Sequence, residues 1–174
     1  MPTTPLAGKA APDLTVPLII GTEWKLSQQD PGSFTLVNVY RGVHCPICED
    51  QLKTLKGLYD QFIDKGVEVL NVSMDTEDKA REAHEGWGLG NIPMGYGLSE
   101  AQAREWGLYL SEATKDGEPD TFAEPALFLV QPDGTLYLAS VSNSPFARTD
   151  VELLLGKIDF IRENAYPARG TKAA

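Results

Sequence analysis

The sequence of 174 residues is poor in the residue types that bind metals or cross-link chains, with two cysteines and two histidines. Two cysteines are too few for a disulfide framework that could replace a hydrophobic core. Together with a neighbouring histidine they offer three ligands in one place, whereas a structural zinc site needs four. We therefore expect no bound metal, and no cofactor-binding motif is visible.

Long apolar runs and an excess of positive charge are also missing. No run approaches the roughly 20 apolar residues that span a bilayer. Residues 1–12 contain one lysine and no apolar stretch, unlike a signal peptide. The net charge is -10, from 15 basic and 25 acidic side chains, and this balance repels phosphate backbones and anionic lipids. We expect a cytoplasmic protein that binds neither nucleic acids nor membranes.

The remaining composition is that of a globular protein. Hydrophobic residues make up 42% of the chain, and the length is close to that of one ordinary domain. No repeat or low-complexity segment is present. We predict one domain over residues 1–174, with an extended N-terminal arm at 1–10 and a loose tail at 167–174.

Strand and helix patterns alternate along the chain. β-Branched and aromatic runs predict buried strands at 34–40, 67–74, 126–130 and 135–141. Helical spacing and capping signals predict helices at 46–65, 76–87, after 99, and from 149 to about 164, with capping boxes at 99–102 and 149–152.

The order of these elements predicts the topology of the sheet. The strand–helix–strand order of the first half requires parallel pairing through a crossover helix. The turn at 131–134 (QPDG) joins the last two strands as an antiparallel hairpin. We therefore predict an α/β fold in which a mixed central β-sheet is flanked by helices on both faces.

Both cysteines lie where the first predicted strand meets the first long helix, in residues 40–48 (YRGVHCPIC). Pro46 suits the first helical position, which places Cys45 at the N-cap and Cys48 in the first turn. This spacing brings both sulfurs to one side of the turn, where they could form a disulfide. A CxxC motif between a strand and a helix indicates redox chemistry. The alternative is a pair of buried cysteines that only fill the core.

The predicted position of the cysteines favours ionisation of one thiol. A helix N-terminus stabilises negative charge, and the thiolate is the reactive form of cysteine. Arg41 and His44 could add positive charge, whereas Glu49 and Asp50 oppose it. His44 could equally be an exposed loop residue. The other histidine, His84, is expected at the surface.

At these residues the chain resembles the AhpC/TSA (redoxin) branch of the thioredoxin superfamily. The resemblance extends over residues 8–164. It includes an opening APDL at 11–14, a strand VLNVSMD at 69–75, and the strand and turn ALFLVQPDG at 126–134. This resemblance implies a thioredoxin-like fold.

The catalytic motif of that family, Pro-x-x-x-Thr-x-x-Cys, is only partly present. Cys48 matches the peroxidatic cysteine, but Cys45 stands at the threonine position and Arg41 at the proline position. The same alignment matches the Cys-Gly-Pro-Cys pair of thioredoxins to Cys45 and Cys48.

A second position also departs from the peroxiredoxin pattern. Peroxiredoxins carry an arginine just before a later strand, and here Pro125 takes that place. Thioredoxins have a cis-proline there, facing the cysteine pair, so we expect Pro125 to be cis. Arg41 or Arg148 could replace the missing arginine.

Three functions follow as hypotheses. The first is a peroxiredoxin-like thiol–disulfide oxidoreductase, in which Cys45, the more exposed of the two cysteines, attacks a protein or small-molecule disulfide. Cys48 resolves the intermediate, and Pro125 helps to hold the substrate. The second is a thiol peroxidase with Cys48 as the peroxidatic and Cys45 as the resolving cysteine. The third is a redox-inert binding module. Either redox function needs a thiol reductant, and a homodimer is a candidate assembly because superfamily members are often dimers.

Overall fold

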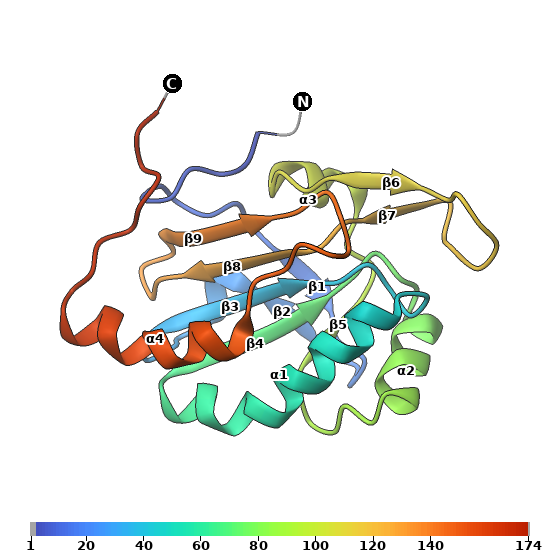
Figure 1. Cartoon of the computed structure of the whole chain (residues 1–174), viewed down its shortest axis with the longest axis horizontal. Coiled ribbons are helices and arrows are strands. Elements are labelled where there is room, and N and C mark those ends of the chain that lie inside the picture. The colour runs from blue at the N-terminus through green and yellow to red at the C-terminus, as the bar shows by residue number, and fades with distance from the viewer. Residues whose placement is uncertain (1–2, 174) are drawn as a thin grey trace.

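The structure is a computed structural model that describes residues 3–173. Its centre is a five-stranded sheet in the order β5-β4-β3-β8-β9 (Figure 1). The strands are β3 (Phe34–Val39), β4 (Val67–Val72), β5 (Met94–Gly95), β8 (Ala126–Val130) and β9 (Leu136–Val141). β3, β4 and β5 run parallel, whereas β8 is antiparallel to both β3 and β9. The predicted mixed sheet, parallel in its first half and ending in a hairpin, is confirmed.

Helices cover the sheet on both faces, as predicted. α1 (Pro46–Asp64) and α4 (Val151–Glu163) lie side by side on one face (Figure 1), where Leu55 and Leu155 pack in one apolar cluster with sheet residues. On the other face, α3 (Glu100–Glu105) and its neighbour Trp106 pack against Val37 and Phe128. α2 (Glu77–Gly86) packs beside the start of α1. The parallel half of the sheet is thus buried on both faces, as such sheets require.

The predicted helix starts agree with the structure at three of four helices. Cys45 is the N-cap of α1, Thr76 caps α2, and both bonds of the capping box at Ser99 are present. The capping box predicted at Thr149 is wrong. Asp150 is the N-cap of α4 instead, and its carboxylate accepts the N–H groups of the second and third helical residues. A carboxylate one residue closer to the helix competes successfully with the threonine hydroxyl.

Two small antiparallel pairs were not predicted, because strands of three residues are too short for a readable alternation. They are β1 (Thr15–Pro17) with β2 (Glu23–Lys25), and β6 (Leu110–Glu112) with β7 (Thr121–Ala123). The β6–β7 hairpin projects beyond the central sheet (Figure 1). Its connecting loop contains the acidic stretch 114–120 (TKDGEPD).

The two ends of the described chain lie at the same side of the molecule (Figure 1). In the predicted N-terminal arm, the N–H of Gly8 donates to the carbonyl of Leu136, and Ala10 forms a β-bridge with Thr135. Residues 1–2 of this arm and residue 174 of the predicted tail lie outside the described residues. Within residues 3–173, no helix is long and apolar enough to cross a membrane.

Candidate active site

The candidate site lies at the carboxyl end of β3, in the middle of the sheet. All six residues of β3 are buried, and the chain leaves this strand directly into the cysteine motif. Cys45 has an extended backbone (φ -107°, ψ 104°), and its sulfur accepts the N–H of Cys48 at 3.4 Å. Pro46 occupies the first helical position, where its missing N–H costs no hydrogen bond. The sequence predicted this local geometry.

The two cysteines approach each other to 2.8 Å and are free thiols. Both are buried, with 1% of Cys45 and none of Cys48 exposed to solvent. The sequence predicted that Cys45 is the more exposed of the two cysteines, but the difference is small because both thiols are buried. Burial results from packing against α2 and the strand end, in a cluster that includes Tyr40 and Ala83.

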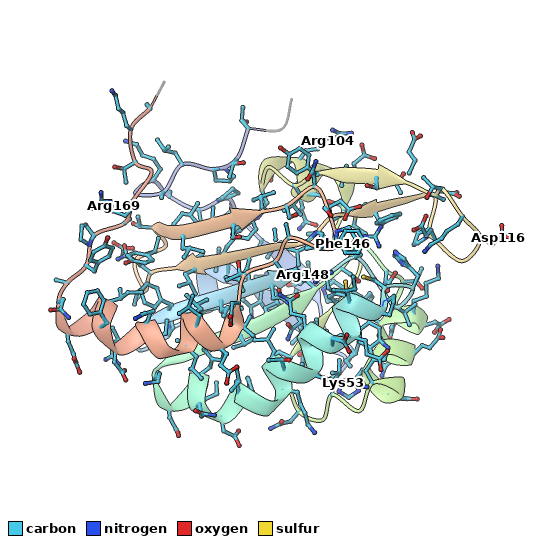
Figure 2. All side chains as sticks on the ribbon, in the orientation of Figure 1. Lys53, Arg104, Asp116, Phe146, Arg148 and Arg169 are labelled. Carbon is cyan, nitrogen blue, oxygen red and sulfur yellow. The ribbon has the colours of Figure 1, made fainter. Side chains whose placement is uncertain are left out.

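Arg148 reaches the pair from the loop that follows β9, and Figure 2 shows it beside the start of α1. Its Nη2 lies 3.0 Å from the sulfur of Cys48 and 3.7 Å from that of Cys45. Its Nη1 donates to Gln51 Oε1 at 2.8 Å, and its Nε donates to the carbonyl of Pro145 at 2.7 Å. A permanent positive charge therefore lies within hydrogen-bonding distance of the sulfurs.

The cysteine pair ionises in a coupled manner. The hydrogen bond from the Cys48 side chain lowers the pKa of Cys45 to about 5, in spite of burial, with further contributions from the Cys48 N–H, Arg41 and Arg148. Burial raises the pKa of Cys48, as do the hydrogen bond and the negative charge of Cys45. At neutral pH the pair therefore holds one thiolate and one proton.

Arg41 also lies next to the pair. Its backbone N–H is 3.4 Å from the sulfur of Cys48. Its guanidinium lies over the ring of Phe122, at 4.8 Å, with Nε 3.0 Å from Glu124 and Nη2 3.7 Å from Glu118. The two carboxylates balance much of its charge, so Arg41 favours the thiolate less than an unpaired guanidinium would.

His44 does not supply the positive charge that the sequence suggested. Its ring packs edge-on against Phe122, with centroids 4.8 Å apart. Burial and the nearby charge of Arg41 lower the pKa of His44, so the ring is neutral at pH 7. Both ring nitrogens are buried without a hydrogen-bond partner among residues 3–173. The expectation of an exposed loop residue is also wrong.

Pro125 is not a cis-proline. No peptide bond within residues 3–173 is cis, so the bond between Glu124 and Pro125 is trans. Here the chain needs only an extended link from β7 into β8, which a trans bond provides. The missing N–H of a proline costs no ladder bond at a strand start. Pro125 is buried, and its carbonyl accepts the N–H of Ser142.

Four polar residues of the site were missed by sequence reasoning: Gln51, Asp75, Glu118 and Glu124. Glu118 lies in the acidic stretch 114–120 of the β6–β7 loop, yet only 4% of its side chain is exposed. Glu124 is likewise buried, and it accepts the hydroxyl of Ser111 at 2.6 Å. A charged residue that ends in a buried ion pair has no local sequence signal, because its partner comes from another element.

Asp75 holds the loop that leads to Cys45. This carboxylate follows β4, is 2% exposed, and accepts the N–H of Val43 at 2.8 Å. Burial raises its pKa. Gly42 passes so close that a Cβ there would lie 2.7 Å from the Asp75 Oδ1, and its φ of +141° is one that side chains rarely adopt. Gly42 is therefore required for this approach.

Replacing Gly42 with alanine is expected to lower the free energy of unfolding by about 1–3 kcal/mol, because strain and collision act together. It should also slow thiol oxidation, since the loop that places Cys45 must move. Gly117→Ala is the matched control, because Gly117 also has a positive φ (+88°) but nothing within 4 Å of its Cβ position. Urea denaturation of both variants measures the difference. Equal losses would show that the contact with Asp75 has no structural role.

The fold and the site define a thioredoxin-like protein with two adjacent thiols at a helix N-terminus. Residues 7–139 match the AhpC/TSA family, and the chain belongs to this family. It is thus a peroxiredoxin-like, thiol-dependent oxidoreductase. The resemblance seen in the sequence is confirmed.

Solved structures of peroxiredoxins share the fold. A cysteine-to-serine mutant of peroxiredoxin 6 of Arenicola marina superposes with a TM-score of 0.76 at 17% identity, over 93% of this chain and 76% of that one. Reduced 2-Cys peroxiredoxin of Plasmodium vivax superposes with a TM-score of 0.71 at 20% identity, over 92% of this chain and 99% of that one. Peroxidoxin BcpB of Mycobacterium tuberculosis superposes with a TM-score of 0.72 at 17% identity, over 90% of this chain and 98% of that one. No curated protein sequence matches the chain.

Proposed function

We propose that this chain reduces a small oxidant, namely a hydroperoxide, by cycling Cys45 and Cys48 between dithiol and disulfide. One observation carries the proposal: two buried cysteine side chains, hydrogen-bonded to each other, lie within hydrogen-bonding distance of the Arg148 guanidinium. Burial favours a small oxidant over an extended protein segment. The trans bond at Pro125 also removes one of the reasons to expect a protein disulfide as the substrate.

The chemistry begins with the Cys45 thiolate. Its sulfur attacks the terminal peroxide oxygen, so that an S–O bond forms and the O–O bond breaks. The alkoxide that leaves takes the proton of Cys48, whose raised pKa keeps that proton available until this step. The Cys48 sulfur then attacks the sulfenic sulfur, and hydroxide leaves as the disulfide forms. Two electrons from a thiol reductant restore the dithiol.

Arg148 has a defined role in this scheme. Its Nη2 lies within hydrogen-bonding distance of both sulfurs, so it favours the thiolate before attack. The same donor can stabilise the negative charge that develops on the leaving oxygen. This role is the one for which the sequence suggested Arg41 or Arg148. Of the two, Arg148 is the stronger candidate, because Arg41 is already paired with two carboxylates.

A second assignment of roles exchanges the cysteines. Arg148 is closer to Cys48 than to Cys45, and the N–H of Arg41 also points to Cys48. In this alternative Cys48 is the peroxidatic cysteine, as its alignment with the family motif implies, and Cys45 resolves. Both assignments end in the same disulfide. The contact between the thiols argues against a redox-inert module.

The cellular setting stays a prediction. The cycle needs a compartment that supplies thiol reductant, and we propose the cytoplasm, where thiols are kept reduced. A homodimer stays a candidate assembly.

Intact-mass spectrometry after one equivalent of hydrogen peroxide tests the function. We expect each chain to lose two hydrogens, with no free thiol left for alkylation, and dithiothreitol should reverse the change. The double variant with both cysteines replaced by serine should show no change. Unaltered mass in the wild type, with both thiols still titratable, would exclude the proposed cycle.

A further inference from the structure

The two guanidinium groups of the site are held in different ways. Arg41 is paired with the carboxylates of Glu118 and Glu124, which offset its charge. Arg148 has no carboxylate within ion-pair distance among the residues that the structure describes, and the acceptor that faces its Nη1 is the neutral amide of Gln51. Arg148 therefore keeps its full positive charge for the sulfurs.

Gln51 is well placed to fix the direction of that charge. It lies three residues after Cys48 on α1, so both side chains project from the same side of the helix. Arg148 comes from a loop, and the other bond that orients it is the local one from Nε to the carbonyl of Pro145. Gln51 thus connects the arginine to the rigid element that carries the cysteines.

We propose that Gln51 is a positioning residue, which holds the Arg148 guanidinium against the Cys45–Cys48 sulfurs without neutralising it. This inference rests on the proposed redox function of the pair. A neutral acceptor suits the task, because a carboxylate at this position would bind the guanidinium more tightly but would cancel the charge that favours the thiolate.

The test compares Gln51→Leu with Gln61→Leu. Gln61 is an exposed residue of the same helix, so the control makes the same substitution away from the site. Thiolate absorbance at 240 nm is followed against pH for each protein. Gln51→Leu should leave about 3- to 10-fold less thiolate at pH 5, as expected for the loss of a hydrogen bond to a charged group. Gln61→Leu should match the wild type.

Two further variants separate positioning from packing. Gln51→Glu keeps the size and the acceptor, so its thermal unfolding should resemble that of the wild type while the thiolate again forms at higher pH. In an Arg148→Ala background, Gln51→Leu should cause no further change, because its effect passes through the arginine. An unchanged titration in Gln51→Leu, or an equal shift in both backgrounds, would overturn the inference. These titrations need no peroxide, so they can fail while the redox cycle itself is demonstrated, and the reverse also holds.

Discussion

A protein with serine in place of Cys45 is expected to react with hydrogen peroxide on the order of 10³-fold more slowly than the wild type, because it lacks the nucleophile. The variant Cys48→Ser should keep rapid oxidation at Cys45, because a serine hydroxyl can still donate the hydrogen bond that lowers the pKa of the Cys45 thiol. Without a resolving thiol, however, it cannot form the disulfide, so its first oxidation product is a sulfenic acid that dimedone can trap. Stopped-flow measurements of the first oxidation, with dimedone trapping of the product, distinguish the two variants.

The opposite result for the two serine variants would exchange the roles of the cysteines. Rapid oxidation that survives Cys45→Ser and disappears in Cys48→Ser would assign the attack to Cys48 and support the exchanged roles. Slow oxidation of the wild type itself, with rapid disulfide formation by diamide, would show a dithiol that accepts other oxidants but not peroxide.

Replacing Arg148 with alanine is expected to have the second largest effect. The thiolate of the wild type forms as the pH rises through about 5, so its oxidation rate should rise over the same range and be level at pH 7. Loss of the guanidinium raises the pKa of the pair, which moves this rise to higher pH. At pH 7 the rate should still fall about 10- to 100-fold, because the developing charge on the leaving oxygen loses its donor.

Arg169→Ala is the control for charge. It removes the same charge from an exposed position on the C-terminal segment, away from Arg148 (Figure 2). Its pH profile should coincide with that of the wild type. A profile for Arg148→Ala that is also unchanged would mean that the arginine contributes neither to ionisation nor to the reaction. Arg148→Lys should recover only part of the rate, since a lysine cannot contact Gln51 and the sulfurs in the same planar fork.

The parts of the site that were predictable are those set by neighbours in the sequence. Pro46 after Cys45 predicts a helix start, and a helix start predicts hydrogen bonding to the sulfur. The continuous runs of β-branched and apolar residues in β3 and β8 likewise predicted the centre of the sheet, because such runs are typical of strands buried on both faces.

Contacts between distant segments were not predictable in this way. Arg148 is separated from Cys48 by 100 residues, and only the folded chain brings its loop over α1. The burial of Cys45 and Glu118 depends on the same long-range packing. Even the suggestion that Arg148 could take part in the site started from the absence of the family arginine.

The position of both thiols in the first turn of one helix has a kinetic consequence. Closure of the disulfide is a first-order event within a single chain, so its rate does not change when the protein is diluted or when subunits separate. The nearby thiol acts at a high effective concentration, which limits the lifetime of the sulfenic acid and hence its further oxidation by excess peroxide. In enzymes whose second sulfur comes from a neighbouring subunit, the rate of disulfide formation does depend on whether the subunits are associated.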